Sequence, residues 1–238
     1  MTTPLTNSGD INTGDIHLVV NEWTTNPNDA MFTQQGNTPY FGSIEYWDVA
    51  DVLNMANLFA SKIAFNDDIS GWNVSHVTDM TLMFTGAYSF NQEIKDWNVS
   101  NVTNMSQMFY AKYKFNDGSN LQIGKWNTIN VVNMSKMFYA NTYFNEDISG
   151  WNVSNVTNMS EMFASTKNFN RDLTNWNTIN VINMNQMFYY SISFNGDLSN
   201  WNVSNVTQMG GMFQGSLFNQ PIGNWNVSNV TQMGGMFQ

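Results

Sequence analysis

The sequence predicts an α/β solenoid of about eight stacked coils, closed at its N-terminus by a helical cap. The first observation is a tryptophan that returns at steps of 24 to 29 residues along most of the 238-residue chain. Self-similarity at a fixed period of this size indicates a repeat architecture. The tryptophans that mark the eight units are Trp47, Trp72, Trp97, Trp126, Trp151, Trp176, Trp201 and Trp225.

The second observation is that other apolar residues keep fixed distances from each tryptophan. Isoleucine or leucine stands three residues before it, valine five after, methionine eight after and phenylalanine twelve after, from Phe59 to Phe237. The first seven units add a Phe-Asn pair, from Phe65-Asn66 to Phe218-Asn219. Each unit therefore presents a set of apolar side chains that it cannot bury alone, and stacking of neighbouring units buries them together.

Within one unit, the spacing of the apolar residues predicts a strand followed by a short helical segment. Ile148, Trp151 and Val153 have the spacing of a solenoid strand, whose alternate side chains face one core. Met159 and Phe163 stand four residues apart and so share one helix face. We therefore expect a short parallel sheet with short helical segments, and at roughly 4.8 Å per coil a rod on the order of 40 Å long.

The N-terminal segment, residues 1–40, reads as a cap, and residues 41–238 as the repeat region with an incomplete last unit. The apolar residues that share one face of a short amphipathic helix are Ile16, Val19, Val20 and Trp23. Thr13 or Asp15 is positioned to cap the start of this helix, and Ala30 to Phe32 suggest another apolar turn. Terminal units of solenoids are atypical because they close the exposed core.

Composition narrows the classes of function. Only 8 Lys and Arg stand against 18 Asp and Glu, a formal net charge of −10, and the basic residues form no patch. This argues against binding to nucleic acid or to an anionic membrane. No apolar run approaches the roughly 18 residues of a membrane helix, so we expect no membrane insertion. Cysteine is absent, so no disulfide or thiolate metal site is expected.

The first residues, MTTPLTNSGD, lack the basic and apolar regions of a signal peptide. This favours an intracellular or virus-particle location over secretion, although the location itself stays unknown.

The many asparagines have two readings. Asn side chains donate, accept and tolerate turns, so copies such as Asn170 and Asn195 could bridge successive coils. The alternative is N-glycosylation, since N-x-S/T triplets recur, as at Asn101, Asn155 and Asn205. Glycans on closely stacked coils would crowd one another, which favours the structural reading.

Methionine and histidine also favour structural roles. All 17 methionines except Met1 and Met31 fall in the two core columns, so they are expected to fill the core and not to bind soft metals. His17 and His76 stand alone in the sequence and predict surface or capping roles.

The stretch FNEDISGWNVSNVTNMSEMFASTKNFNRDLTNW resembles the roughly 25-residue repeat of the BspA-like, mycoplasma-lipoprotein-type surface proteins, a leucine-rich-repeat-like group. The resemblance covers Phe41 to Gln238 and implies a right-handed solenoid. It further implies adhesion, binding or structural roles, on bacterial surfaces or in large-virus particles, with no catalytic residues to carry over.

Three surface features are candidate sites. The first is an acidic column that could bind divalent cations such as calcium, or could satisfy the turn before each strand. It consists of Asp68, Glu93, Asp147, Asp172 and Asp197. The second is the four-residue expansion Asp117, Gly118, Ser119 and Asn120, which could mark a binding face. The third is the end of the last unit, namely Gly234, Gly235, Phe237 and Gln238, where either further units or another chain would cover the open coil.

No catalytic motif is present, and the acidic residues that could pair belong to a repeated column. The sequence therefore predicts a non-enzymatic structural or protein-interaction scaffold without cofactor, a component of a large-virus particle or a surface protein. Its partners would be other proteins, structural subunits or further copies of the chain. The alternative is an adhesion module that binds glycans or divalent cations along the repeated polar and acidic face.

Overall fold

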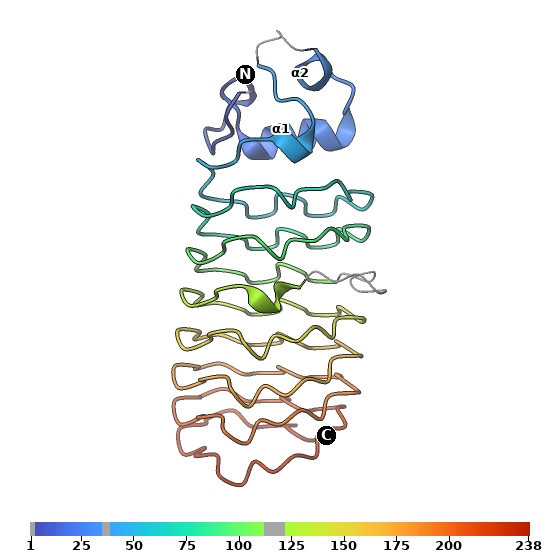
Figure 1. The fold of residues 1–238 in the computed structure, drawn as a ribbon. Helices are drawn as coiled ribbons and strands as arrows, with labels where there is room; N and C mark the ends of the chain where they lie inside the picture. Colours follow the sequence, from blue (N-terminus) through green and yellow to red (C-terminus); the bar gives the residue numbers. More distant parts are fainter. Residues whose placement is uncertain (1–2, 35–38, 112–121) are drawn as a thin grey trace.

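The computed structural model describes residues 3–34, 39–111 and 122–238. The chain begins in a small cap that contains the two α-helices and then winds through successive coils that lie one above another (Figure 1). The C-terminus lies at the far end of this stack from the N-terminus.

The cap contains the helix that the sequence predicts. A 3₁₀ turn, η1 (Ile11–Thr13), precedes α1 (Ile16–Thr25), and α2 (Ala30–Thr33) follows. Of the two candidate capping residues, Asp15 caps α1, because its carboxylate accepts from the amides of His17 and Leu18. No helix in the described ranges is both long and apolar enough to cross a membrane.

The cap takes the place of a preceding coil above the first repeat. The side-chain amide of Asn7 donates to the carbonyl oxygen of Asn54 at 2.8 Å, and its oxygen accepts from the amides of Leu53 and Asn54 at 3.0 Å. His17 Nε2 lies 3.0 Å from the carbonyl oxygen of Ala56, which assigns Nε2–H as the donor. His17 therefore has the capping role that its isolation in the sequence predicts.

Each repeat contacts the next through one parallel β-bridge and a series of backbone hydrogen bonds. The bridged residues, in order along the stack, are Asn54, Asp79, Asn104, Asn133, Asn158, Asn183, Gln208 and Gln232. Beside the bridge, amides of one coil donate to carbonyl oxygens of the following coil, as Met159 does to Asn183 at 2.9 Å. The expected parallel sheet is thus one bridge wide in the described part of the chain, while the handedness and the leucine-rich-repeat-like class stay predictions.

The short helical segment expected around Met159 to Phe163 is replaced by tight turns. The amide of Met162 donates to Met159 O at 3.2 Å, and that of Thr166 to Phe163 O at 3.0 Å. Glu161 and Ser165, the third residues of these turns, have φ of 55° and 57°, as in type II turns. A residue in the left-handed conformation interrupts an α-helix. In this conformation the amide of Glu161 donates to Asn185 O in the next coil. The helical turns η2 (Ile44–Tyr46) and η3 (Ile123–Lys125) instead lie just before a tryptophan.

The interior consists of aromatic ladders that run along the stack. The phenylalanines twelve residues after each tryptophan stack face to face from Phe59 to Phe237, with ring centroids 5.5 to 5.7 Å apart. Each tryptophan from Trp72 to Trp225 donates its Nε1–H to an Ile or Leu carbonyl oxygen in the preceding coil, at 2.8 to 3.3 Å. The buried indole is thereby both packed and hydrogen-bonded, as a buried tryptophan requires.

The asparagines bridge the coils, as the structural reading predicts. The amide of Asn195 donates to Asn170 Oδ1 at 2.9 Å, one step of the Phe-Asn ladder. In a second column, Asn155 and Asn205 donate their Nδ2–H groups to carbonyl oxygens of the preceding coil at 2.8 Å. His76 occupies this second column, where its ring nitrogen lies 2.8 Å from Ala50 O. These side chains hold the wall together, which supports the structural reading of the N-x-S/T triplets over glycosylation.

Asn141 is a polar residue of the interior whose side chain lacks hydrogen-bond partners. Its residue is fully buried, yet neither its side-chain oxygen nor its side-chain nitrogen has a hydrogen-bond partner. The equivalent residue of the next coil, Thr166, is also fully buried but donates its hydroxyl to Phe138 O at 2.8 Å. Burying a polar group without a partner costs about 1–3 kcal/mol, so this coil carries a local destabilisation.

We therefore expect Asn141→Thr to raise the free energy of unfolding by about 1 kcal/mol, because the threonine hydroxyl can reach the carbonyl of Phe109 as Thr166 reaches Phe138. The reciprocal variant Thr166→Asn should lower it by a similar amount. Urea unfolding followed by tryptophan fluorescence measures both. A loss of stability in Asn141→Thr would show that the asparagine is satisfied in solution.

Candidate functional site

The acidic column lies at the turn before each tryptophan and takes part in the hydrogen bonds of that turn. The carboxylates of Asp68, Asp147 and Asp197 each accept from the amide of the serine two residues later, at 2.8 to 3.0 Å. Asp172 Oδ1 instead accepts from the amide of Asp197 at 2.9 Å. Glu93 pairs with Lys95 at 2.9 Å. These contacts support the turn-forming interpretation of the column.

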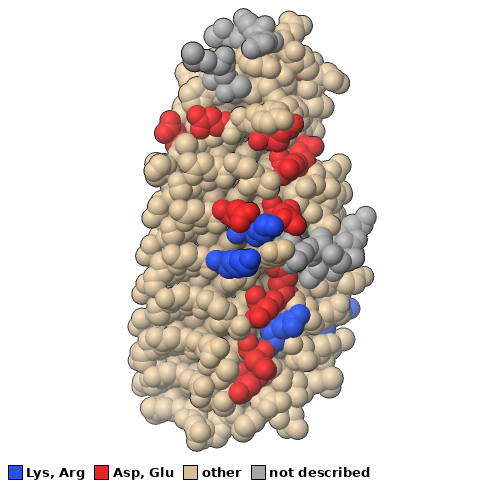
Figure 2. All heavy atoms as spheres, in the orientation of Figure 1, with Lys and Arg blue, Asp and Glu red and all other residues tan. Residues whose placement is uncertain are grey.

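The serine hydrogen bonds also set the charge state of the column. They lower the pKa of Asp68, Asp147 and Asp197 below the ordinary 3.8, and Arg171 lowers that of Asp147 further. The three carboxylates are therefore ionised at neutral pH. Within the described ranges, no three His, Cys, Asp or Glu side chains converge closely enough to hold a metal ion. The Asp and Glu side chains instead form an interrupted line along the stack, with Lys and Arg beside it (Figure 2).

Of the two other candidate sites, the structure describes the end of the last unit but not the four-residue expansion. The expansion Asp117, Gly118, Ser119 and Asn120 lies outside the described residues. In the last unit, Gly234 and Gln238 accept backbone hydrogen bonds from Gly211 and Gly215 at 2.9 and 2.7 Å.

The last unit is covered on one side only. Gly235 has a φ of 68°, the left-handed conformation found at this position in the other coils. The ring of Phe237 stacks on that of Phe213 with centroids 5.7 Å apart but remains 63% exposed. The second face of the Phe237 ring is the one that the equivalent phenylalanine of an internal coil packs against the next coil.

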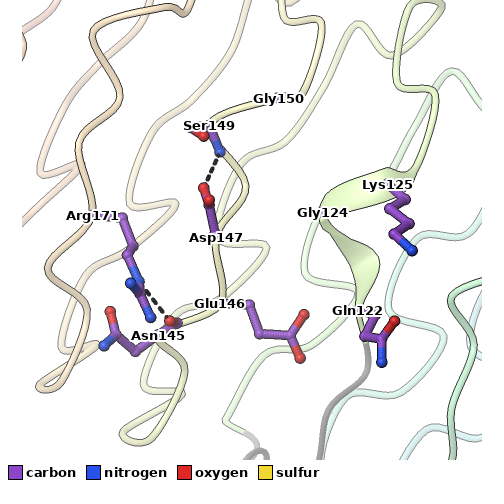
Figure 3. Close-up of a pocket in the computed structure, with 9 residues that line it drawn as sticks. All are labelled: Gln122, Gly124, Lys125, Asn145, Glu146, Asp147, Ser149, Gly150 and Arg171. Carbon is purple, nitrogen blue, oxygen red and sulfur yellow. Dashed lines mark hydrogen bonds between the residues drawn. The ribbon is translucent and has the colours of Figure 1, made fainter.

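A cavity of about 540 Å³ opens on the side of the stack. Its lining comes from the turns of three successive coils: Gln122, Gly124, Lys125, Asn145, Glu146, Asp147, Ser149, Gly150 and Arg171. Figure 3 shows Arg171 and Asn145 on one side, Lys125 and Gln122 on the opposite side, and Glu146 between them. The cavity thus brings two cations and two carboxylates to one place.

Hydrogen bonds fix the polar groups of this cavity. Arg171 Nε donates to the carbonyl oxygen of Asn145 at 2.9 Å. Glu146 is 9% exposed, and its Oε2 accepts from the amide of Ile123 at 3.1 Å. Of the lining residues, the sequence singled out only Asp147. The available signal was a glycine in the turn before the tryptophan in two successive units, Gly124 two residues before Trp126 and Gly150 one residue before Trp151.

These features define a repeat protein whose units stack through shared hydrogen bonds and aromatic ladders. The chain belongs to the family described as "Mycoplasma protein of unknown function, DUF285", whose model matches residues 28–120, 117–217 and 172–238. The three overlapping matches confirm the repeat character. No curated protein and no solved structure matches the chain.

The serine contacts of the acidic column predict a pH dependence. Because the folded-state pKa of Asp147 is lowered, its contribution to stability is present above the unfolded-state pKa and is lost as the pH falls through the folded-state value. Ser149→Ala removes the largest cause of the lowering, so we expect the pKa of Asp147 to rise toward its ordinary value. Carboxyl chemical shifts followed by NMR between neutral and acidic pH measure this change.

The matched control is Ser154→Ala, on another turn, which should leave the Asp147 titration unchanged. An unaltered pKa in Ser149→Ala would mean that the hydroxyl does not contact the carboxylate in solution.

Proposed function

We propose that this chain is a non-enzymatic scaffold, an α/β solenoid whose wall presents a regular array of polar side chains to protein partners. The observation that carries the proposal is the coupling of every coil to its neighbours. From Trp72 to Trp225 each tryptophan is hydrogen-bonded to the preceding coil, and the phenylalanine ladder is continuous over the repeats. Exterior side chains are therefore held at a constant spacing, which suits repeated contacts with extended partners.

The chemistry of the wall supports such contacts. On the face shown in Figure 2, many of the charged side chains follow one line along the stack, and residues 198–238 contain no Asp, Glu, Lys or Arg at all. A neutral, amide-rich wall offers donors and acceptors without the repulsion of like charges. Both settings suggested by the BspA-like resemblance, a cell surface and a large-virus particle, use proteins that pack side by side or bind repetitive partners.

The exposed face of the last coil is an apolar surface available for self-association. Phe237, Met233 and Val227 are 63%, 40% and 39% exposed, whereas their counterparts in internal coils are buried. This face continues the coil–coil interface that recurs through the whole stack. We infer that in the 238-residue chain it is covered by a second copy.

Light scattering of the purified chain across a range of concentrations tests this inference. The 238-residue chain should form a defined oligomer, and the double variant Met233→Ser, Phe237→Ser should shift the molar mass to that of a monomer. Leu217→Ser is the matched control, because Leu217 is 71% exposed on the side of the stack and its loss should leave the oligomer intact. A monomer at every concentration would contradict self-association at this face.

The competing function is a divalent-cation-dependent adhesion module along the acidic column. A ligand that binds only the folded state raises the melting temperature, by an amount that grows with the logarithm of its concentration above the dissociation constant. Because the carboxylates of Asp68, Asp147 and Asp197 already accept hydrogen bonds within their turns, we expect millimolar calcium to leave the melting temperature unchanged. Magnesium at the same ionic strength is the control for general screening. A rise specific to calcium would favour the adhesion module.

A further inference from the structure

The cavity between Arg171 and Lys125 has the features of a binding site for a small polar ligand. Its volume of about 540 Å³ falls within the ordinary range for ligand pockets, but the residues that line it in the described part of the chain include no aromatic or aliphatic side chain of the kind found in a site for apolar molecules. Amide, hydroxyl and charged groups surround it. A ligand that fits must therefore satisfy hydrogen bonds on several sides at once.

The cavity is built into the backbone of the stack. At Gly124 a β-carbon would lie 2.1 Å from the carbonyl oxygen of Asp147 in the next coil, so no other residue fits without displacing that coil. Two of the three coils that line the hollow are therefore in close backbone contact, and Arg171 comes from the third. Glu146 adds a carboxylate that is nine-tenths buried and fixed by the Ile123 amide at 3.1 Å. These constraints hold the lining in place before any ligand arrives.

Two cations flank the cavity, and Arg171 is the one that is oriented by a hydrogen bond to the chain. Arg171 uses its Nε to donate to Asn145 O, which orients the rest of the guanidinium, and Figure 3 shows Lys125 across the cavity from it. A planar guanidinium recognises a carboxylate through paired hydrogen bonds, and an ammonium supplies a second positive charge. The neighbouring side chains of Glu146 and Asp147 make the site poor for a highly charged phosphate group, because their carboxylates would repel it.

The carboxylates and amides specify the remainder of the ligand. Carboxylate oxygens accept hydrogen bonds from hydroxyl groups, and the side chains of Gln122 and Asn145 both donate and accept. Together they match a sugar ring that also carries a carboxylate, and we propose that this cavity binds an acidic sugar, a uronic-acid unit whose carboxylate pairs with Arg171 and whose hydroxyl groups face Lys125, Glu146 and Gln122. This site goes beyond the scaffold role and does not depend on it.

NMR titration of the isotope-labelled chain with a trimer of galacturonic acid tests the proposal, with maltotriose as the neutral control. Amides of Lys125, Ser149 and Gly150 should shift with the acidic trimer and should not shift with maltotriose. Arg171→Gln and Lys125→Gln should each weaken binding roughly ten-fold, as expected for the loss of one charge-assisted hydrogen bond. Lys167→Gln, an exposed lysine outside the cavity, should bind as the unaltered chain does.

Four results would overturn the proposal. They are the absence of shifts at these amides, equal binding of maltotriose, equal weakening by Lys167→Gln, and equal binding of glycine or acetate. The last result would mean that the cavity recognises a carboxylate group alone and not a sugar. Because Arg171 also contacts Asn145, Lys125→Gln provides the decisive variant if Arg171→Gln perturbs the local fold. None of these results bears on self-association, so failure here leaves the scaffold proposal unchanged.

Discussion

The hydrogen bonds between successive coils are the interaction on which the rest of this structure depends. Successive coils share a single β-bridge, and the rest of each unit consists mainly of turns. A unit therefore has little regular secondary structure of its own to stabilise its fold. Its amides find their acceptors in the next coil, as Glu161 does in Asn185, and its tryptophan donates to the coil before. Backbone groups inside a wall must be paired, so each internal coil depends on both of its neighbours.

The ends of the stack follow from the same constraint. At the N-terminus, Asn7 and His17 reproduce with side chains the donors that a preceding coil would supply to Asn54 and Ala56. At the other end Phe237 has a ring partner on one face only. The repeat positions with exposed apolar side chains in this last coil are Val227, Met233 and Phe237.

A site for a single small ligand in such a molecule resides where units differ, because identical units present identical surfaces. The repeated asparagines, serines and acidic residues are consumed largely by turns and inter-coil bridges, so they contribute spacing more than specificity. The cavity lined by Lys125, Glu146 and Arg171 arises where successive units carry glycine and charged residues in place of the usual ones. A scaffold of regular coils thus acquires a local site without changing its architecture.

The sequence by itself determined the repeat, the cap and the core. Fixed distances from each tryptophan identify the buried columns, since equivalent positions in stacked coils face one interior, and the spacing of Ile16 to Trp23 identifies α1. Tertiary structure decided the rest. The step of three residues from Met159 to Met162 is compatible with both a helix and a type II turn. The structure has the turn, because Glu161 adopts a left-handed conformation in which its amide donates to Asn185 O of the next coil. Likewise Lys125 and Arg171 lie 46 positions apart in the numbering, and only the stacking of coils brings them to one cavity.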